Sequence, residues 1–102
     1  MGGCAEETDI DTKIELLKKL AYEGDASAQY HLGLVYFNGN VVPKDYKKAY
    51  AWLNIAKTKT SVVEWTKNKL AYLTKKMTKE QIAQAKSLSI EISKRIEANR
   101  KD

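Results

Sequence analysis

Few side chains in this sequence have the chemistry of a catalytic or metal site. The 102 residues include a single cysteine, Cys4, and a single histidine, His31. A serine or cysteine nucleophile needs a general base within hydrogen-bond reach, and a zinc site needs several cysteine or histidine ligands. Gly33 and Gly39 do not fit a phosphate-binding loop, because no Gly-Lys-Ser/Thr sequence follows. We therefore predict that the chain is not an enzyme, has no catalytic residues and binds no metal or cofactor.

Cys4 lies in an N-terminal segment, residues 1–10, that is small, acidic and without helical period. This composition predicts a flexible leader. The Gly-Cys pair is similar to the processed start of a bacterial lipoprotein, but the apolar segment that should precede it is absent. A lipid anchor at Cys4 therefore lacks support, and two interpretations remain: Met1 and Gly2 were added in cloning, or an export signal was trimmed. Cytoplasmic and periplasmic locations both stay open, and no stretch approaches the roughly 20 apolar residues of a transmembrane helix.

Charge is distributed unevenly along the chain. Lys and Arg number 18 against 13 Asp and Glu, a formal net charge of +5. Residues 44–86 hold 11 Lys and 3 acidic residues, whereas residues 1–25 hold 7 acidic residues and 3 Lys. A basic stretch of this kind can attract nucleic acid or another polyanion. The aromatic residues within it are Tyr46, Tyr50, Trp52, Trp65 and Tyr72. Lysines spread along helices are usually a solubilising face, so nucleic acid is the alternative partner and not the expected one.

Helices are predicted to carry almost all of these residues. The chain has one proline, 43% apolar and 30% charged residues, and no alternating strand pattern occurs. Apolar residues recur at helical spacing in five segments: one from Asp11 or Thr12 to residue 23, then residues 26–38, about 46–56, 62–77 and 79–98. A single domain, residues 11–99, contains them all, with a repeat core over about 24–59 and capping helices over about 62–98.

The ends of these segments carry recognisable capping residues. Asp25 and Asp45 are placed to accept hydrogen bonds from the first turn of a helix. Thr78 and Gln81 form a capping-box pattern, in which each side chain bonds the backbone N–H of the other. Gly39 can adopt the left-handed conformation that ends a helix. These signals divide the chain into short helices with short connectors.

Gly33 stands inside the second helix, beside an apolar stripe that includes Leu32 and Tyr36. A glycine there costs roughly 1 kcal/mol relative to alanine, which indicates that another helix approaches too closely for a side chain. The break at residues 24–25 recurs at 60–61, 36 residues on, a period within the range of helical repeats. The sequence therefore predicts an all-α fold, a short right-handed α-solenoid of about five helices in antiparallel pairs.

The same region carries an ordered set of residues: Gly24-Asp25, Ala28-Gln29, Leu32-Gly33, Tyr36, Gly39, Asp45, Lys48-Ala49, Trp52 and Ala56. This set resembles a Sel-one-like repeat, a relative of the tetratricopeptide repeat. Residues 77–86 also look like the segment that often closes an array in that family. Val41 stands where the family usually has a second loop glycine, and Lys57 and Thr60 stand where it usually has Ala and Gly.

The resemblance implies an interaction scaffold, often bacterial, that binds a protein or peptide without catalysis. The cysteine-rich branch linked to β-lactams is not indicated, because Cys4 is alone. We expect a monomer whose partner contacts residues that lie outside the apolar stripe. These candidates are Tyr30, His31, Leu34, Phe37, Asn38 and Trp65. Two alternatives stay open: the residues on the second helix pack against the neighbouring helix pair, and Trp65 belongs to the core.

Overall fold

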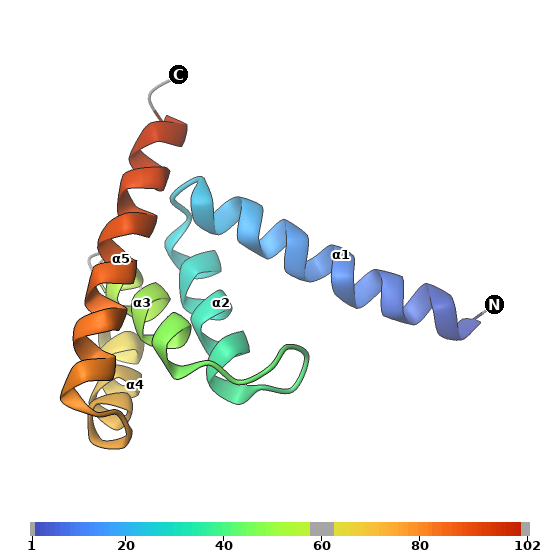
Figure 1. Cartoon of the computed structure of the whole chain (residues 1–102). Helices are drawn as coiled ribbons and strands as arrows, with labels where there is room; N and C mark the ends of the chain where they lie inside the picture. Colours follow the sequence, from blue (N-terminus) through green and yellow to red (C-terminus); the bar gives the residue numbers. More distant parts are fainter. Residues whose placement is uncertain (1, 58–62, 101–102) are drawn as a thin grey trace.

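The computed structural model describes residues 2–57 and 63–100, most of which lie in five helices. They are α1 (Gly2–Tyr22), α2 (Ala26–Asn38), α3 (Tyr46–Ala56), α4 (Val63–Lys76) and α5 (Lys79–Arg100). The described residues contain no strand, and the predicted all-α helical architecture is confirmed. α2 and α3 form an antiparallel pair, α5 packs along α3, and α1 leads into α2 at an angle (Figure 1).

The first helix begins earlier than the sequence pattern indicated. We expected a start at Asp11 or Thr12 after a leader, but α1 already begins at Gly2. Residues 4–22 contain no glycine or proline, and alanine and glutamate favour a helix even without apolar periodicity. The N-terminal part of α1 extends away from the other helices (Figure 1). A flexible segment over residues 1–10 and a single domain over 11–99 both stay predictions.

The predicted helix boundaries are confirmed elsewhere. The carboxylates of Asp25 and Asp45 each accept a hydrogen bond from the backbone N–H three residues on, at 3.0 and 3.1 Å. Thr78 and Gln81 form the reciprocal capping box, with bonds of 3.0 and 3.1 Å. Gly39 ends α2 in the left-handed region, at φ 69°. The predicted break at 60–61 and the apolar Val62 lie outside the described residues.

Gly33 lies where α2 packs closely against α3. A Cβ atom at this position would lie 2.9 Å from Cγ of Leu53 and 3.4 Å from the carbonyl oxygen of Ala49. The side chain of Leu53 is 0% exposed, so its surroundings leave it little room to move. The close helix approach predicted from Gly33 is confirmed, and the helix that approaches is α3.

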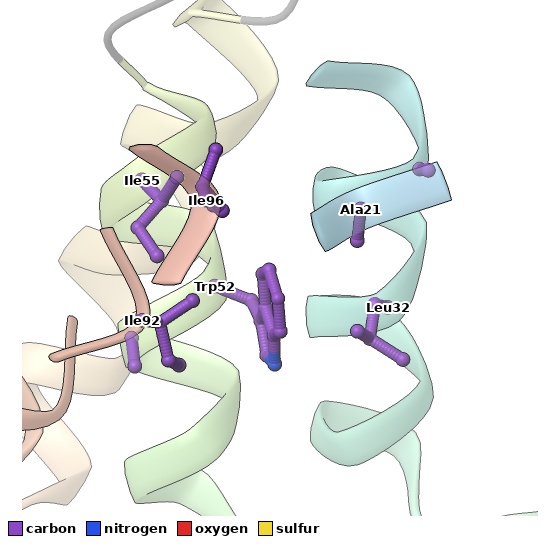
Figure 2. Packing of buried hydrophobic residues seen from close by; sticks show 8 residues of the cluster. Ala21, Leu32, Trp52, Ile55, Ile92 and Ile96 are labelled. Carbon is purple, nitrogen blue, oxygen red and sulfur yellow. The ribbon is translucent and has the colours of Figure 1, made fainter. Parts of the chain in front are cut away.

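α3 is the central helix, because hydrophobic clusters cover it on two sides. One cluster joins Trp52 to Ala21 of α1, Leu32 of α2 and Ile92 of α5 (Figure 2). The other joins Leu53 to apolar residues of α4 and the start of α5. Consecutive residues of a helix point about 100° apart, so Trp52 and Leu53 reach different neighbours. Trp52 is only 3% exposed, because α5 covers that side of α3.

The predicted apolar stripe of α5 faces the core. Its members Ala85, Ser89, Ile92 and Ile96 are buried, and Ile82 is half-buried. Ser89 is the polar member, and its hydroxyl accepts a hydrogen bond from Nδ2 of Asn54 at 3.2 Å and donates one to the Lys86 carbonyl at 2.7 Å. The hydroxyl is thus satisfied within the helix packing, and the stripe positions α5 along α3.

Gln29 fastens the end of α1 to α2. Its side chain is 1% exposed, and Nε2 donates a 3.0 Å hydrogen bond to the carbonyl oxygen of Ala21. A buried side-chain amide is costly unless it is bonded. In Gln29 the Nε2 end is bonded, whereas the buried Oε1 has no hydrogen-bond partner in the described part of the chain. Gln29 therefore links the end of α1 to α2 through its amide N–H group.

We expect Gln29→Ala to lower the free energy of unfolding by about 1–3 kcal/mol, because it removes a buried hydrogen bond and leaves a space between α1 and α2. Urea unfolding followed by circular dichroism measures this loss. Ser27→Ala, at an exposed position on the same helix, is the control and is expected to change stability by less than about 0.5 kcal/mol. Equal losses in the two variants would show that Gln29 does not fasten α1.

Candidate functional site

The structure divides the six predicted contact residues between two neighbouring faces. Tyr30 and Phe37 of α2 lie beside α4, where Tyr30 meets Trp65 with ring centroids 5.6 Å apart. His31, Leu34 and Asn38 instead line a hollow on the side of α2 that faces α1. Six residues that the sequence grouped together therefore do not form one site.

Four aromatic residues gather between α2 and α4, and we call this group the aromatic surface: Tyr30, Phe37, Trp65 and Tyr72. The ring centroids of Phe37 and Tyr72 are 5.4 Å apart. Trp65 is 57% exposed and Tyr72 is 44% exposed. Tyr30 and Phe37 are partly buried against the core and support the two exposed rings from below. Within the aromatic surface, Tyr30 and Phe37 therefore pack against neighbouring helices, whereas Trp65 and Tyr72 are exposed to solvent.

The interpretation of Trp65 as a core residue is wrong. The buried positions of α4 and its end are Thr66, Leu70, Leu73 and Met77. They follow one another at helical spacing, with Thr66 0% exposed. Trp65 is the neighbour of Thr66 and therefore lies about 100° away from the buried side. Because the polar Thr66 occupies one of the buried positions, the apolar residues of α4 alone do not indicate which side of the helix is buried.

Lysines approach the aromatic rings of this surface. Nζ of Lys69 lies 5.2 Å from the ring centroid of Phe37, and Nζ of Lys76 lies 5.5 Å from that of Tyr72. Cation–π contacts of this length attract a lysine to a ring face. Along α4 the order is aromatic, lysine, aromatic, lysine, at spacings of three and four residues. The aromatic surface therefore also carries positive charge.

The hollow beside α1 is small and mainly apolar. It measures about 450 Å³, and α1 and the loop after α2 complete its lining. His31 is exposed, and its Nδ1 lies 2.7 Å from the Ser27 carbonyl oxygen, to which it donates. His31, the single histidine of the sequence, is thus bonded within its own helix.

A larger groove lies on another side of the molecule, between α1, α2, α3 and α5, and we call it the basic groove. Its volume is about 610 Å³. The lining residues are Lys18, Tyr22, Leu32, Tyr36, Lys48, Trp52, Leu88, Glu91, Ile92, Lys94 and Arg95. This groove could not be predicted from the sequence, because its residues are scattered over more than 70 positions and its charges belong to separate helices. Trp52 lies on the floor of this groove.

Neither a metal centre nor a membrane span is found in the described part of the chain. No three His, Cys, Asp or Glu side chains in it are arranged to hold a metal ion. None of its helices is both long and apolar enough to cross a bilayer.

The α2–α3 pair is the part of the chain that a known family describes. Residues 26–60 match the model of the Sel1 repeat. No curated protein and no solved structure matches the chain significantly. The matched segment includes Gly33 and the α3 residues that pack against it, so the family pattern coincides with the closest helix contact in the structure.

Proposed function

From the match of residues 26–60 to the Sel1 repeat, we propose that the chain is a monomeric, non-catalytic interaction module that binds a partner protein through its aromatic surface. Sel1 repeats suggest a protein-interaction role, and proteins that contain them are generally non-catalytic scaffolds. The observation that carries the proposal is Trp65, a large aromatic side chain that is 57% exposed on an ordered helix. Tryptophan and tyrosine are enriched among the residues that dominate binding energy at interfaces.

Two features support binding at this surface. The rings of Tyr30 and Phe37 pack against the core, so a partner would meet a surface that is already largely ordered. Pre-ordered contacts lower the entropy lost on association. Trp65 and Tyr72 lie on the same side of α4, seven residues apart, which gives an extended partner segment two anchoring points about two turns apart.

Photo-crosslinking tests this proposal directly. We expect a photoreactive phenylalanine analogue at position 65 to crosslink to a discrete partner protein in a lysate of the native organism. Excess unlabelled protein should compete with this product, and excess unlabelled Trp65→Ala protein should not. The same analogue at exposed position 86 on α5 is the matched control and should give no such product. Equal crosslinking at 65 and 86, or none at 65, would contradict binding at the aromatic surface.

Binding of single-stranded nucleic acid is the second candidate function, and the lysines beside the aromatic rings favour it. Stacking on aromatic residues together with lysine contacts is how such strands are bound without sequence preference. Only part of the basic segment 44–86 can act in this way, because Tyr50 and Trp52 are buried. A crosslink from position 65 that nuclease removes, and that disappears between about 50 and 200 mM salt, would establish this function instead of the first.

A further inference from the structure

We propose that the basic groove is a second binding site, which takes an acidic peptide segment carrying one large apolar side chain. The site is separate from the aromatic surface and rests on the proposed function only in that the occupant is a protein. Its volume of about 610 Å³ lies within the range of sites that enclose a ligand group. Four helices contribute to it, so it exists only in the folded chain.

The floor of the groove is apolar and rigid. Trp52 is 3% exposed, Leu32 1% and Ile92 5%, and all three belong to one hydrophobic cluster (Figure 2). The ring of Tyr22 meets Trp52 edge to face, with centroids 5.1 Å apart. An apolar side chain of a ligand would contact the half-buried Tyr22, Tyr36 and Leu88, which line the groove and pack against this floor.

The rim of the groove is strongly basic. It carries Lys18, Lys48, Lys94 and Arg95 against a single acidic residue, Glu91, a net charge of +3. The cations come from α1, α3 and α5, so they surround the apolar floor on several sides. Charge complementarity then calls for a ligand whose acidic groups flank its apolar side chain.

Two of these cations are already held in place by aromatic rings. Nζ of Lys48 lies 5.3 Å from the ring centroid of Tyr36, and the guanidinium carbon of Arg95 lies 5.7 Å from that of Tyr22. Such contacts restrain long side chains and leave their N–H groups free to donate to a carboxylate.

The same geometry disfavours a nucleic-acid ligand here. Lys48 and Arg95 lie over the rings of Tyr36 and Tyr22, so these ring faces are not open to stacking with a base. The basic rim would therefore attract the phosphates of a nucleic acid, but its bases would have no open aromatic face on which to stack. An acidic peptide uses both the charge and the apolar floor.

Fluorescence anisotropy with labelled probes tests the ligand class. The first probe is a short peptide of glutamate and aspartate with one central phenylalanine. The second has alanine in place of the phenylalanine, and the third is a single-stranded oligonucleotide of equal charge. We expect the phenylalanine peptide to bind at least about fivefold more tightly than the alanine peptide, since one apolar side chain contributes about 1–3 kcal/mol. Equal affinity of the two peptides, or tighter binding of the oligonucleotide, would overturn the proposal.

Charge reversal tests the location of the site. Lys48→Glu with Arg95→Glu is expected to weaken binding of the phenylalanine peptide at least about tenfold. The matched control, Lys67→Glu with Lys75→Glu, makes the same change in net charge at exposed positions of α4 and should change affinity less than about twofold. Equal losses in the two double variants would show non-specific attraction and overturn the site. Trp65→Ala should leave peptide affinity unchanged, so this site and the aromatic surface succeed or fail separately.

Discussion

Trp52→Ala is expected to lower the free energy of unfolding by about 3–5 kcal/mol. Trp52 is 3% exposed and joins α1, α2 and α5 to the central helix, so its removal opens a cavity bounded by three helices. A domain of this size is usually stable by only about 5–15 kcal/mol. The variant should therefore lose a large part of the total, and its melting temperature should fall by about 12 °C or more. Urea and thermal unfolding, both followed by circular dichroism, measure the two quantities.

The second tryptophan supplies the matched control for this prediction. Trp65 is 57% exposed, so Trp65→Ala removes the same atoms without opening a cavity of comparable size. We expect it to cost about 1 kcal/mol or less. If the two alanine variants were destabilised equally, Trp52 would not be the buried centre that the structure places in α3.

Gly33→Leu should have the other large effect. Even the first atom of the new side chain would lie 2.9 Å from Cγ of Leu53, and the remaining atoms would have to enter the space between α2 and α3. Overpacking costs about 1–3 kcal/mol or more in a well-packed core, and here it also forces two helices apart. We therefore expect a loss of about 3 kcal/mol or more, measured by urea unfolding.

The control for Gly33→Leu is a small-to-large change at an open position of a helix. Ala83 is exposed on α5, so Ala83→Leu adds a bulky side chain without a clash. It should leave stability within about 0.5 kcal/mol of the original. A Gly33→Leu variant as stable as Ala83→Leu would show that the two helices do not pack tightly at residue 33.

The helix caps could be predicted from the sequence because their signals are local. Asp25, Asp45 and the pair Thr78–Gln81 cap helices because the groups that they satisfy lie within three residues. Gly33 is also a local signal. A glycine inside a helix is destabilising, and the close approach of a neighbouring helix is the feature that requires it. The stripe of α5 was recognisable because it keeps its period through a polar residue, Ser89, that bonds within the helix packing.

Features that depend on residues distant in the sequence but close in space could not be predicted. Trp65 is exposed and not in the core, because α4 presents its neighbour Thr66 to the core. The start of α1 at Gly2 could not be predicted, because residues 2–10 have no apolar period and include two glycines, which disfavour a helix. The basic groove combines Lys18, Lys48 and Arg95, which approach each other only when α1, α3 and α5 have packed. Such a site cannot be found from residue spacing along one helix.

The most direct test of the account is a double-mutant cycle between Gly33 and Leu53, because the close packing of α2 on α3 positions every surface described above. Urea unfolding, with an osmolyte present to keep the weaker variants folded, gives the free energy of each variant. In the original chain we predict that Gly33→Ala is destabilising, because the clash with Leu53 outweighs the gain in helix propensity. In the Leu53→Ala background the clash is gone, and the same substitution should stabilise by about 1 kcal/mol. An effect of the same sign and size in both backgrounds would contradict the close helix packing on which the fold and both proposed binding surfaces depend.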